Sequence, residues 1–600
     1  MQQNNLPWRS EETLQQIEPV KIKTLIDTAL GKTKADIVVA GADLVNVYSG
    51  EVLRGQSVAI KGARIAFVGD RAEHTIGPGT RIIDATGKIL IPGLIDPHTH
   101  PVPLFNLDEF LKYAMIGGTT TIVSETVELV IPMGYRGVQE FLKAAGKQPV
   151  KIFVTVGPVP SLSPSSKLNF LRPEKLRRLL KQKNIVGQGE IPWPFVVDGD
   201  GEILQLYAET LKAGKQIVGH SAGARGSKLQ AYVASGVSSC HEPTTAEEVM
   251  ERLRLGLHVM IREGDIRRDL EVIASIKDKH IDFRRLVFCT DGMMPSNVMK
   301  QGYMESVVQK AIDLGFDPIV AIQMATINPA EYFCLDNLIG GIAPGKCADM
   351  VILTDLRNIE AEMVISNGRI IAQRGKILVP PIRHHYPKSL TRIVPLPRKI
   401  KPADFKIRIQ GTDKQVTVRV INQVTDIVTR EEKVDMTSQN GFLEADSERD
   451  LLKVAFIDRA SNPGKMFTGF IKGFGMKKGA FASSAPWDLS GIIVVGARDE
   501  DMAGAVNRII TLQGGTVVYN KGQVLAELPL TIAGYISDLP TETVNHRSEE
   551  IQHKLTELGT SLLDANLTLT ALTTSVIPFL RICESGLMDI GKGELVDLIL

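Results

Sequence analysis

The chain has few cysteines, almost no net charge and no long apolar run, and each shortage excludes a class of protein. Its five cysteines are scattered and form no C-x-x-C pair, which argues against a disulfide framework and suits a reducing cytosol. The 69 basic residues are balanced by 68 acidic ones, so no overall field attracts nucleic acid or an acidic membrane. No run reaches membrane-spanning length, and the polar residues 1–5 do not resemble a signal peptide. We therefore expect a cytoplasmic protein whose partner is a small molecule.

The chain is long enough for several domains, and its middle part alternates between strand and helix patterns. A length of 600 residues exceeds what one core supports, and the 44% hydrophobic and 23% charged fractions are typical of globular proteins. Strand patterns at 119–123, 151–156, 216–219, 258–261 and 286–289 are separated by helical patterns such as 166–183, 202–213 and 245–254. Such alternation favours a parallel sheet with right-handed crossovers. Over this length it predicts an α/β fold with a (β/α)8 barrel.

Short strand patterns flank the barrel on both sides. Residues 35–68 show strands separated by glycine turns, which predicts antiparallel β structure, and a similar pattern returns after residue 340. The predicted division is a helical N-terminal extension (1–34), a composite β-sandwich (35–90 with 338–392), the barrel (91–337) and a C-terminal α+β domain (403–600).

His98-Thr99-His100 is the most informative pattern in the chain. It closes the apolar run 89–97, which has the character of a buried inner strand. Residues i and i+2 of a strand point to the same side, so the two imidazoles of this motif can bind one metal ion. The carboxyl ends of barrel strands are also where such folds place their chemistry. A bare H-x-H motif arises often by chance, so the prediction depends on further candidate ligands.

Further candidate ligands follow other short apolar stretches. Glu190, His220, His241 and Asp291 each stand just past such a stretch, so a barrel would bring them together at its mouth. Four histidines and two carboxylates there predict a site for one or two divalent metals. The metal would lower the pKa of a bound water, and Asp291 could pass the proton of that water to a leaving amine. Glu190 is a reasonable bridge between two ions.

The predicted substrate-binding residues are Arg262, Glu263 and Glu242. Arg262 and Glu263 come just after a strand, and a buried salt bridge is an equally good interpretation of them. His258 lies inside a strand and is expected to be structural. The remote histidines are expected to be solvated: His74, His280, His384, His385 and His546.

Longer motifs resemble a known family. Residues 92–100 resemble the opening motif of the amidohydrolase superfamily. Segments throughout the barrel and the C-terminal region closely resemble bacterial adenine deaminases: 219–222, 238–242, 259–264, 321–331, 469–475, 492–496 and 527–530.

The resemblance implies a metal-dependent barrel, a β-sandwich made from both flanks and a C-terminal domain particular to this group. It implies hydrolysis of adenine to hypoxanthine and ammonia, with manganese or iron as the usual metal and zinc as an alternative, and a homodimer. It also implies metal or catalytic roles for six residues: His98, His100, Glu190, His220, His241 and Asp291.

Several positions depart from the family pattern. Val127 stands where the family has the histidine of D-P-H-E, and Gly292-Met293 replace the last two residues of D-D-R. Tyr303 replaces the histidine of E-G-H-I-D, and residues 486–491 replace A-H-D-S-H-N and lose both histidines. Loss of polar partners lowers discrimination for a polar substrate. Three hypotheses stay open: an adenine deaminase, an amidohydrolase for another aminated heterocycle, cyclic amide or N-acyl compound, and a non-catalytic paralogue.

Overall fold

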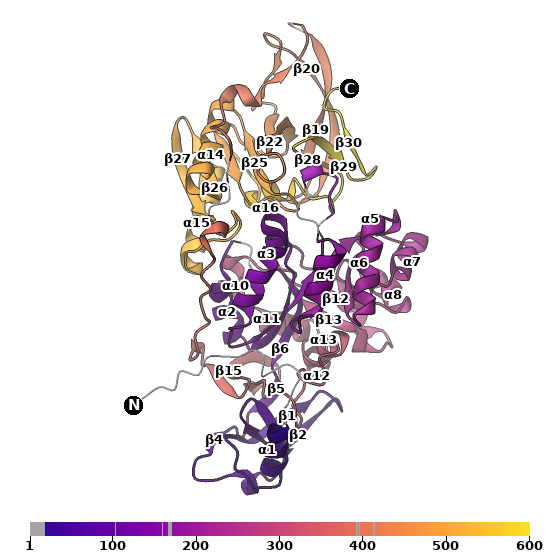
Figure 1. Cartoon of the computed structure of the whole chain (residues 1–600), viewed down its shortest axis with the longest axis vertical. Helices are drawn as coiled ribbons and strands as arrows, with labels where there is room; N and C mark the ends of the chain where they lie inside the picture. Colours follow the sequence, from indigo (N-terminus) through magenta and orange to yellow (C-terminus); the bar gives the residue numbers. More distant parts are fainter. Residues whose placement is uncertain are drawn as a thin grey trace.

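The chain forms three stacked parts, with a parallel barrel in the middle (Figure 1). The computed structural model describes residues 19–101, 104–158, 160–165, 171–391, 394, 396–411 and 414–600. The start of the predicted N-terminal helical extension lies outside these residues, and helix α1 (Pro19–Ala29) is its described part. None of the described helices combines the length and apolarity needed to cross a membrane.

The barrel predicted from the alternating pattern is confirmed. Its eight strands are paired in the order β13-β12-β11-β10-β9-β8-β7-β6, and every pairing is parallel. The two outermost strands meet at a seam where the backbone N–H of Asp291 donates to the carbonyl of His98 at 3.0 Å. The strands are β6 (Leu94–Thr99), β7 (Thr119–Ser124), β8 (Lys151–Val156), β9 (Ile185–Pro192), β10 (Gln216–His220), β11 (Ser239–Cys240), β12 (His258–Arg262) and β13 (Leu286–Cys289).

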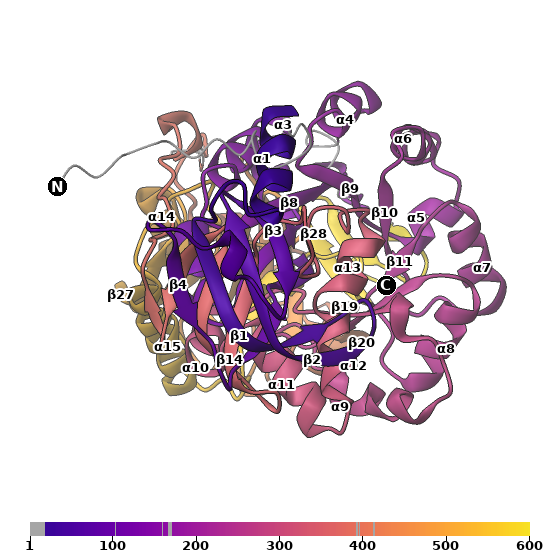
Figure 2. The ribbon, with the colours of Figure 1, turned by 90° about the horizontal axis from the view of Figure 1, so that it is seen from below.

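Helices connect successive strands and surround the barrel (Figure 2). Their ends are fixed by ordinary capping: Asp200 accepts hydrogen bonds from the first turn of α6, and Thr245 does the same for α8. The helices are α2 (Leu107–Ile116), α3 (Val127–Ala145), α4 (Pro173–Leu180), α5 (Trp193–Val197), α6 (Gly201–Lys212), α7 (Gly226–Ala234), α8 (Ala246–Arg254), α9 (Leu270–Ile273), α10 (Pro295–Gln301), α11 (Met304–Asp313), α12 (Pro318–Met324) and α13 (Ile327–Tyr332).

The apolar run before His98 is two strands and not the single one expected. The chain leaves β5 (Ile89–Pro92), which belongs to the flanking sheet, and enters β6 of the barrel at Gly93. A Cβ at Gly93 would lie 2.1 Å from the Thr120 hydroxyl oxygen, so a side chain cannot fit where the chain passes between the sheets. A buried run shows no period that distinguishes one strand from two.

The flanking strands form one nine-stranded sheet drawn from both sides of the barrel. Strands β1, β2 and β3 are antiparallel as expected, whereas β1 pairs in parallel with β4 and β5. The antiparallel prediction for residues 35–68 is therefore confirmed, and β4 and β5 lie beyond that range. The strands are β1 (Ile37–Asn46), β2 (Glu51–Lys61), β3 (Arg64–Gly69), β4 (Arg81–Asp84), β5, β14 (Met350–Asp355), β15 (Asn358–Ser366), β16 (Arg369–Gln373) and β17 (Lys376–Ile377).

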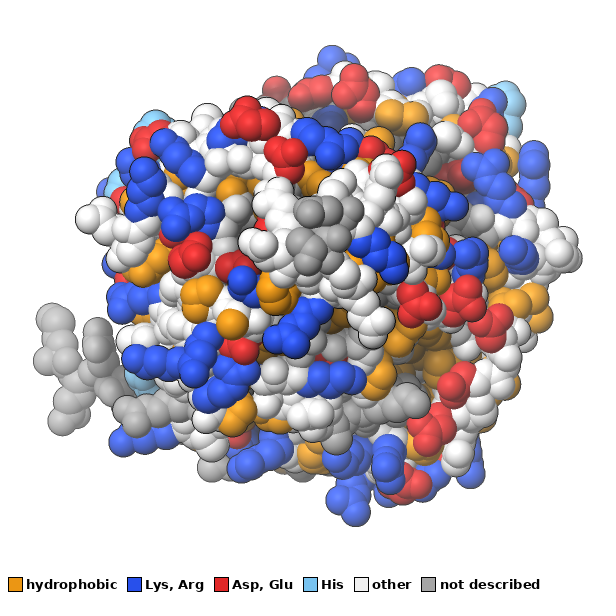
Figure 3. All heavy atoms as spheres, turned by 90° about the horizontal axis from the view of Figure 1, so that it is seen from above, with side chains coloured by type: hydrophobic (Ala, Val, Ile, Leu, Met, Phe, Trp, Pro, Cys, Tyr) orange, Lys and Arg blue, Asp and Glu red, His pale blue; other side chains and the backbone are white. Residues whose placement is uncertain are grey.

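The C-terminal part has a second eight-stranded sheet, ordered β20-β19-β23-β22-β25-β24-β26-β27. It lies at the opposite end of the barrel from the flanking sheet (Figure 1). The surface of the molecule at this end intersperses basic with acidic side chains, in keeping with the balanced composition (Figure 3). The elements are β18 (Ile407–Arg408), β19 (Gln415–Gln423), β20 (Thr429–Thr437), β21 (Phe442–Leu443), β22 (Leu452–Asp458), β23 (Met466–Lys472), β24 (Ala480–Ser483), β25 (Gly491–Gly496), α14 (Asp499–Leu512), β26 (Gly515–Asn520), β27 (Gln523–Pro529), α15 (Thr541–Glu557), α16 (Ala565–Ala571), β28 (Leu580–Cys583), β29 (Gly586–Asp589) and β30 (Glu594–Val596).

Candidate metal centre

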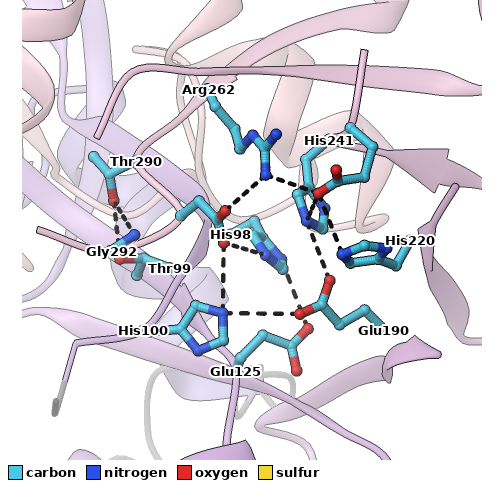
Figure 4. A network of polar contacts seen from close by, with 12 residues as sticks. His98, Thr99, His100, Glu125, Glu190, His220, His241, Arg262, Thr290 and Gly292 are labelled. Atoms are coloured by element: carbon cyan, nitrogen blue, oxygen red, sulfur yellow. Dashed lines mark hydrogen bonds and ion pairs between the residues drawn. The ribbon is translucent and has the colours of Figure 1, made fainter. Parts of the chain in front are cut away.

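All six predicted ligands lie together at the carboxyl ends of the barrel strands (Figure 4). Each comes from the end of a strand, because parallel strands present their last residues at the same edge. The positions are His98 in β6 and His100 just after it, Glu190 in β9, His220 at the end of β10, His241 after β11 and Asp291 after β13.

The ligand atoms are close enough to share ions. Asp291 Oδ1 lies 3.1 Å from His98 Nε2 and 3.5 Å from His100 Nε2. Glu190 Oε2 lies 3.1 Å from His241 Nε2, and Glu190 Oε1 lies 4.0 Å from His100 Nε2. The cluster therefore spans the barrel mouth with alternating imidazole and carboxylate groups.

Three overlapping ligand groups satisfy the spacing of a metal site among the described residues. They are His98-His100-Glu190, His98-His241-Asp291 and Glu190-His220-His241, and within each group the ligand atoms lie within 4.8 Å of one another. His220 Nδ1 and His241 Nδ1 are buried with no hydrogen-bond partner in the described part of the chain. Imidazole and carboxylate ligands of this kind suit divalent transition metals, so the cluster suggests a divalent metal.

The electrostatics of the cluster also suit a cation. Burial raises the pKa of Glu190, but the His241 and His220 rings outweigh burial and bring that pKa to about 2. Burial lowers the pKa of His241, but Glu190 and Asp291 outweigh it and hold the pKa well above its usual range. The carboxylates are thus ionised and draw positive charge into the site. Bound metal would supply that charge and release the imidazole protons.

Arg262 and Glu242, predicted to bind substrate, lie against the cluster. Glu242 Oε1 is 3.3 Å from His220 Nε2 and 3.2 Å from His241 Nε2. Arg262, only 3% exposed, places Nη1 at 2.7 Å from Glu242 and 3.1 Å from Asp291. The contacts of Arg262 are therefore those of a buried ion-pair partner, which was the alternative interpretation. Its guanidinium fixes the carboxylates of Glu242 and Asp291 at the barrel mouth.

Glu263 does not join the cluster. Its carboxylate lies 2.8 Å from Lys310 Nζ on α11, and successive residues of an extended chain point to opposite sides. Arg262 occupies the inner side, so Glu263 faces the surrounding helices, and its predicted substrate contact stays a prediction that this placement does not support.

Two carboxylates behind the ligands were missing from the predicted site. Glu128 Oε1 lies 2.6 Å from His100 Nδ1, and Glu125 Oε1 lies 3.6 Å from His98 Nδ1. A carboxylate on the far nitrogen of a ligating histidine fixes the ring orientation. Both residues follow the end of β7, so the rule that found Glu190 could have found them. Val127, one of the departures, is the first residue of α3 between them.

Asp96 ties the first histidine strand to the last barrel strand. It accepts hydrogen bonds from the hydroxyls of Thr290 at 2.6 Å and Tyr303 at 2.5 Å. Burial raises its pKa to about 6, and these donors oppose the rise. Tyr303, a second departure, thus supports the strand that carries His98.

The remaining histidines mostly behave as expected. His280, His385 and His546 are exposed, and His74 is exposed while its Nε2 donates to the Ala29 carbonyl at 2.9 Å. His384 was wrongly expected to be solvated, because its Nε2 lies 3.2 Å from a Glu140 carboxylate on α3.

The comparisons with known proteins agree with this arrangement. The model of the amidohydrolase family matches residues 89–371, and that of the adenine deaminase C-terminal domain matches residues 426–594. An adenine deaminase of Clostridium botulinum (strain 657 / Type Ba4) is 35% identical over 587 residues, covering 96% of this chain and 97% of the relative. One from Moorella thermoacetica is 37% identical over 588 residues, covering 96% and 98%. A solved molinate hydrolase is 17% identical, with a TM-score of 0.45 over 59% of this chain and 98% of its own.

The barrel and the matched family model define a hydrolase of the amidohydrolase class that acts on C–N bonds. The match over nearly the whole length is more specific. The chain belongs to the adenine deaminase family.

Proposed function

We propose that this protein hydrolyses adenine to hypoxanthine and ammonia. The observation that carries the proposal is that the complete set of predicted ligands meets at one barrel mouth in a chain aligned end to end with adenine deaminases. The non-catalytic hypothesis is disfavoured, because a protein without catalysis has no need for four histidines and two carboxylates in one buried cluster.

The metal would be held by the residues of the cluster, and manganese or iron is the ion we propose, with zinc as the alternative. The two oxygens of Glu190 lie near different histidines, His241 and His100, so Glu190 would contribute ligand atoms to both halves of the cluster. A divalent ion there would supply an activated water for attack on the amine-bearing ring carbon.

Asp291 is the residue we assign to proton transfer. One carboxylate oxygen faces His98 and His100, and the other accepts a hydrogen bond from Arg262 at 3.1 Å. Burial raises its pKa, but the surrounding histidines outweigh burial and hold the pKa well below its usual range. An ionised Asp291 can accept a proton from the attacking water and return it to the leaving amine. Arg262 acts as a positioning residue, since it fixes the orientation of Asp291 and Glu242.

A second candidate function is an amidohydrolase reaction on another aminated heterocycle. It is favoured by the apolar Val127, which stands between two carboxylates that support the histidines. Fewer polar partners near the substrate would relax the preference for adenine.

Ammonia release tests these alternatives directly. Metal-stripped protein would be reconstituted with Mn²⁺ and incubated with adenine, and hypoxanthine and ammonia would be measured together. Equal amounts of both products, lost on chelation and in His241→Ala, are expected. Bound metal without turnover of adenine, but with turnover of another aminated base, would favour the second candidate.

The setting of the enzyme is part of the proposal. The five cysteines are all free, which supports a reducing cytoplasm. The homodimer implied by the family resemblance is checked by sedimentation of the reconstituted protein.

A further inference from the structure

The C-terminal part presents the segment 486–489 to the barrel mouth, held from one side by the loop after His100. The Tyr535 hydroxyl donates to the carbonyls of Pro486 and Leu489, each at 2.7 Å. The Tyr535 carbonyl accepts from the N–H of Leu104 at 3.3 Å, and Leu104 follows β6 closely. The Leu104 carbonyl in turn accepts from the backbone N–H of Ser537 at 2.9 Å. The segment is thus fixed relative to the strand that carries His98.

A second loop of the mouth holds the same segment from another side. Ser575 donates its backbone N–H to Asp488 Oδ2 at 3.1 Å, and its hydroxyl lies 2.9 Å from that of Ser161. Ser161 lies in the loop after β8. Nearby, Ser163 of that loop donates to the buried Glu584 at 2.7 Å. Asp488 therefore sits between loops that follow two different barrel strands.

Asp488 is anchored through only one of its two oxygens. Both of its recorded hydrogen bonds, from Thr574 and Ser575, reach Oδ2, and none among the described residues reaches Oδ1. Its backbone adopts φ +62°, a conformation that costs energy in a residue other than glycine and is retained only where the surroundings impose it. The side chain keeps partial solvent access although it lies deep between the two parts.

Asp488 also lies within electrostatic reach of the metal cluster. Burial raises the pKa of its carboxyl, the charge of Glu190 raises it further and His220 lowers it. These two residues stand on β9 and β10, next to the β8 loop that Ser575 contacts. The carboxyl of Asp488 therefore lies on the same side of the barrel as the cluster, beside the loop after β8 that Ser575 contacts.

We propose that Asp488 is a specificity-determining residue, whose Oδ1 accepts a hydrogen bond from a ring N–H at the end of the substrate base away from the reacting carbon. The inference rests on the proposed function and deepens it. Adenine held with its amine-bearing carbon at the cluster directs its imidazole N–H toward the opposite wall of the mouth. A carboxylate oxygen without another partner is a strong acceptor for such a donor. The C-terminal part would then complete the active site.

Discrimination between two substrates tests this inference. The kcat/KM for adenine would be compared with that for its N7-methyl and N9-methyl derivatives, which have no ring N–H. The comparison would be made for the full-length parent, Asp488→Ala, Asp488→Asn and a control, Asp564→Asn. Asp564 is another carboxylate of the C-terminal part that caps a backbone N–H, at the start of α16. Metal content and thermal unfolding of every variant would be measured alongside.

We expect kcat/KM for adenine to fall about 10- to 100-fold in both Asp488 variants, with the methylated bases affected far less. The preference for adenine should therefore shrink while metal content stays at the parental value, and Asp564→Asn should keep the parental preference. Asp488→Asn should also unfold near the parental midpoint, because asparagine tolerates a positive φ and keeps an oxygen for the Thr574 and Ser575 donors. Equal losses on all bases, or an unchanged preference, would overturn the inference about Asp488. A parent that releases no ammonia from any of these bases would instead contradict the proposed function.

Discussion

Arg262 contacts three buried carboxylates at the barrel mouth, so its removal has a calculable effect. Its guanidinium lies 2.7 Å from Glu242, 3.1 Å from Asp291 and 3.3 Å from Asp269. The side chains of these acids are 9%, 5% and 7% exposed, so water cannot replace the lost partner. Arg262→Met keeps much of the side-chain volume and removes only the charge and its hydrogen bonds.

The expected cost is about 3–5 kcal/mol, the range for leaving one partner of a buried ion pair without compensation. For a barrel of this size, that cost lowers the thermal unfolding midpoint by roughly 6–20 °C. Saturating Mn²⁺ should recover part of the lost stability, because a divalent ion beside Asp291 would compensate the negative charge that Arg262 no longer neutralises.

Arg268→Met is the matched control on the same segment. Arg268 is 42% exposed and pairs with Asp265 at 3.1 Å, so its removal should cost under about 1 kcal/mol. Scanning calorimetry of both variants, with and without Mn²⁺, measures the difference. Similar midpoints for Arg262→Met and Arg268→Met in the metal-free state would refute the reasoning.

Two further variants test parts of the site and of the barrel wall. Tyr303→Phe removes the donor to Asp96, which should cost about 1–3 kcal/mol of stability and weaken Mn²⁺ affinity, and a parental affinity would show that Asp96 holds its strand without Tyr303. Burial, with a smaller contribution from Arg285, lowers the pKa of His258 from 6.5 to about 4. Between pH 6.5 and pH 4 the unfolded chain binds a proton that the folded chain does not, so this contribution is complete above pH 6.5 and is lost as the pH falls. His258→Gln should lose less unfolding free energy than the parent as the pH falls through that window, by about 1–2 kcal/mol after solvent screening is allowed for. Denaturant unfolding at each pH measures the difference, and identical pH profiles for the two proteins would argue against a buried neutral imidazole.

The barrel and its ligand set could be predicted because both depend on local patterns. A polar residue after a short apolar run places His220, His241 and Asp291 at one edge, whatever the details of packing. The same rule applied to the segment after β7 would have added Glu125 and Glu128, which lie on either side of the departure at Val127.

Other features depend on contacts that local pattern does not encode. The break at Gly93 follows from the Thr120 side chain of a neighbouring strand, and the outward direction of Glu263 follows from Lys310 on a distant helix. The placement of Asp488 over the mouth depends on hydrogen bonds to Thr574 and Ser575, which lie more than eighty residues further along the chain. Long-range partners of this kind become visible only in the folded structure.

The most direct test of the central claim is anomalous scattering from crystals of the Mn²⁺-reconstituted, active protein at the manganese absorption edge. The account predicts signal inside the cluster, within bonding distance of His98, Glu190 and His241, with a second peak if Glu190 bridges two ions. Active crystals with no anomalous signal among these residues, or with manganese bound elsewhere, would contradict it.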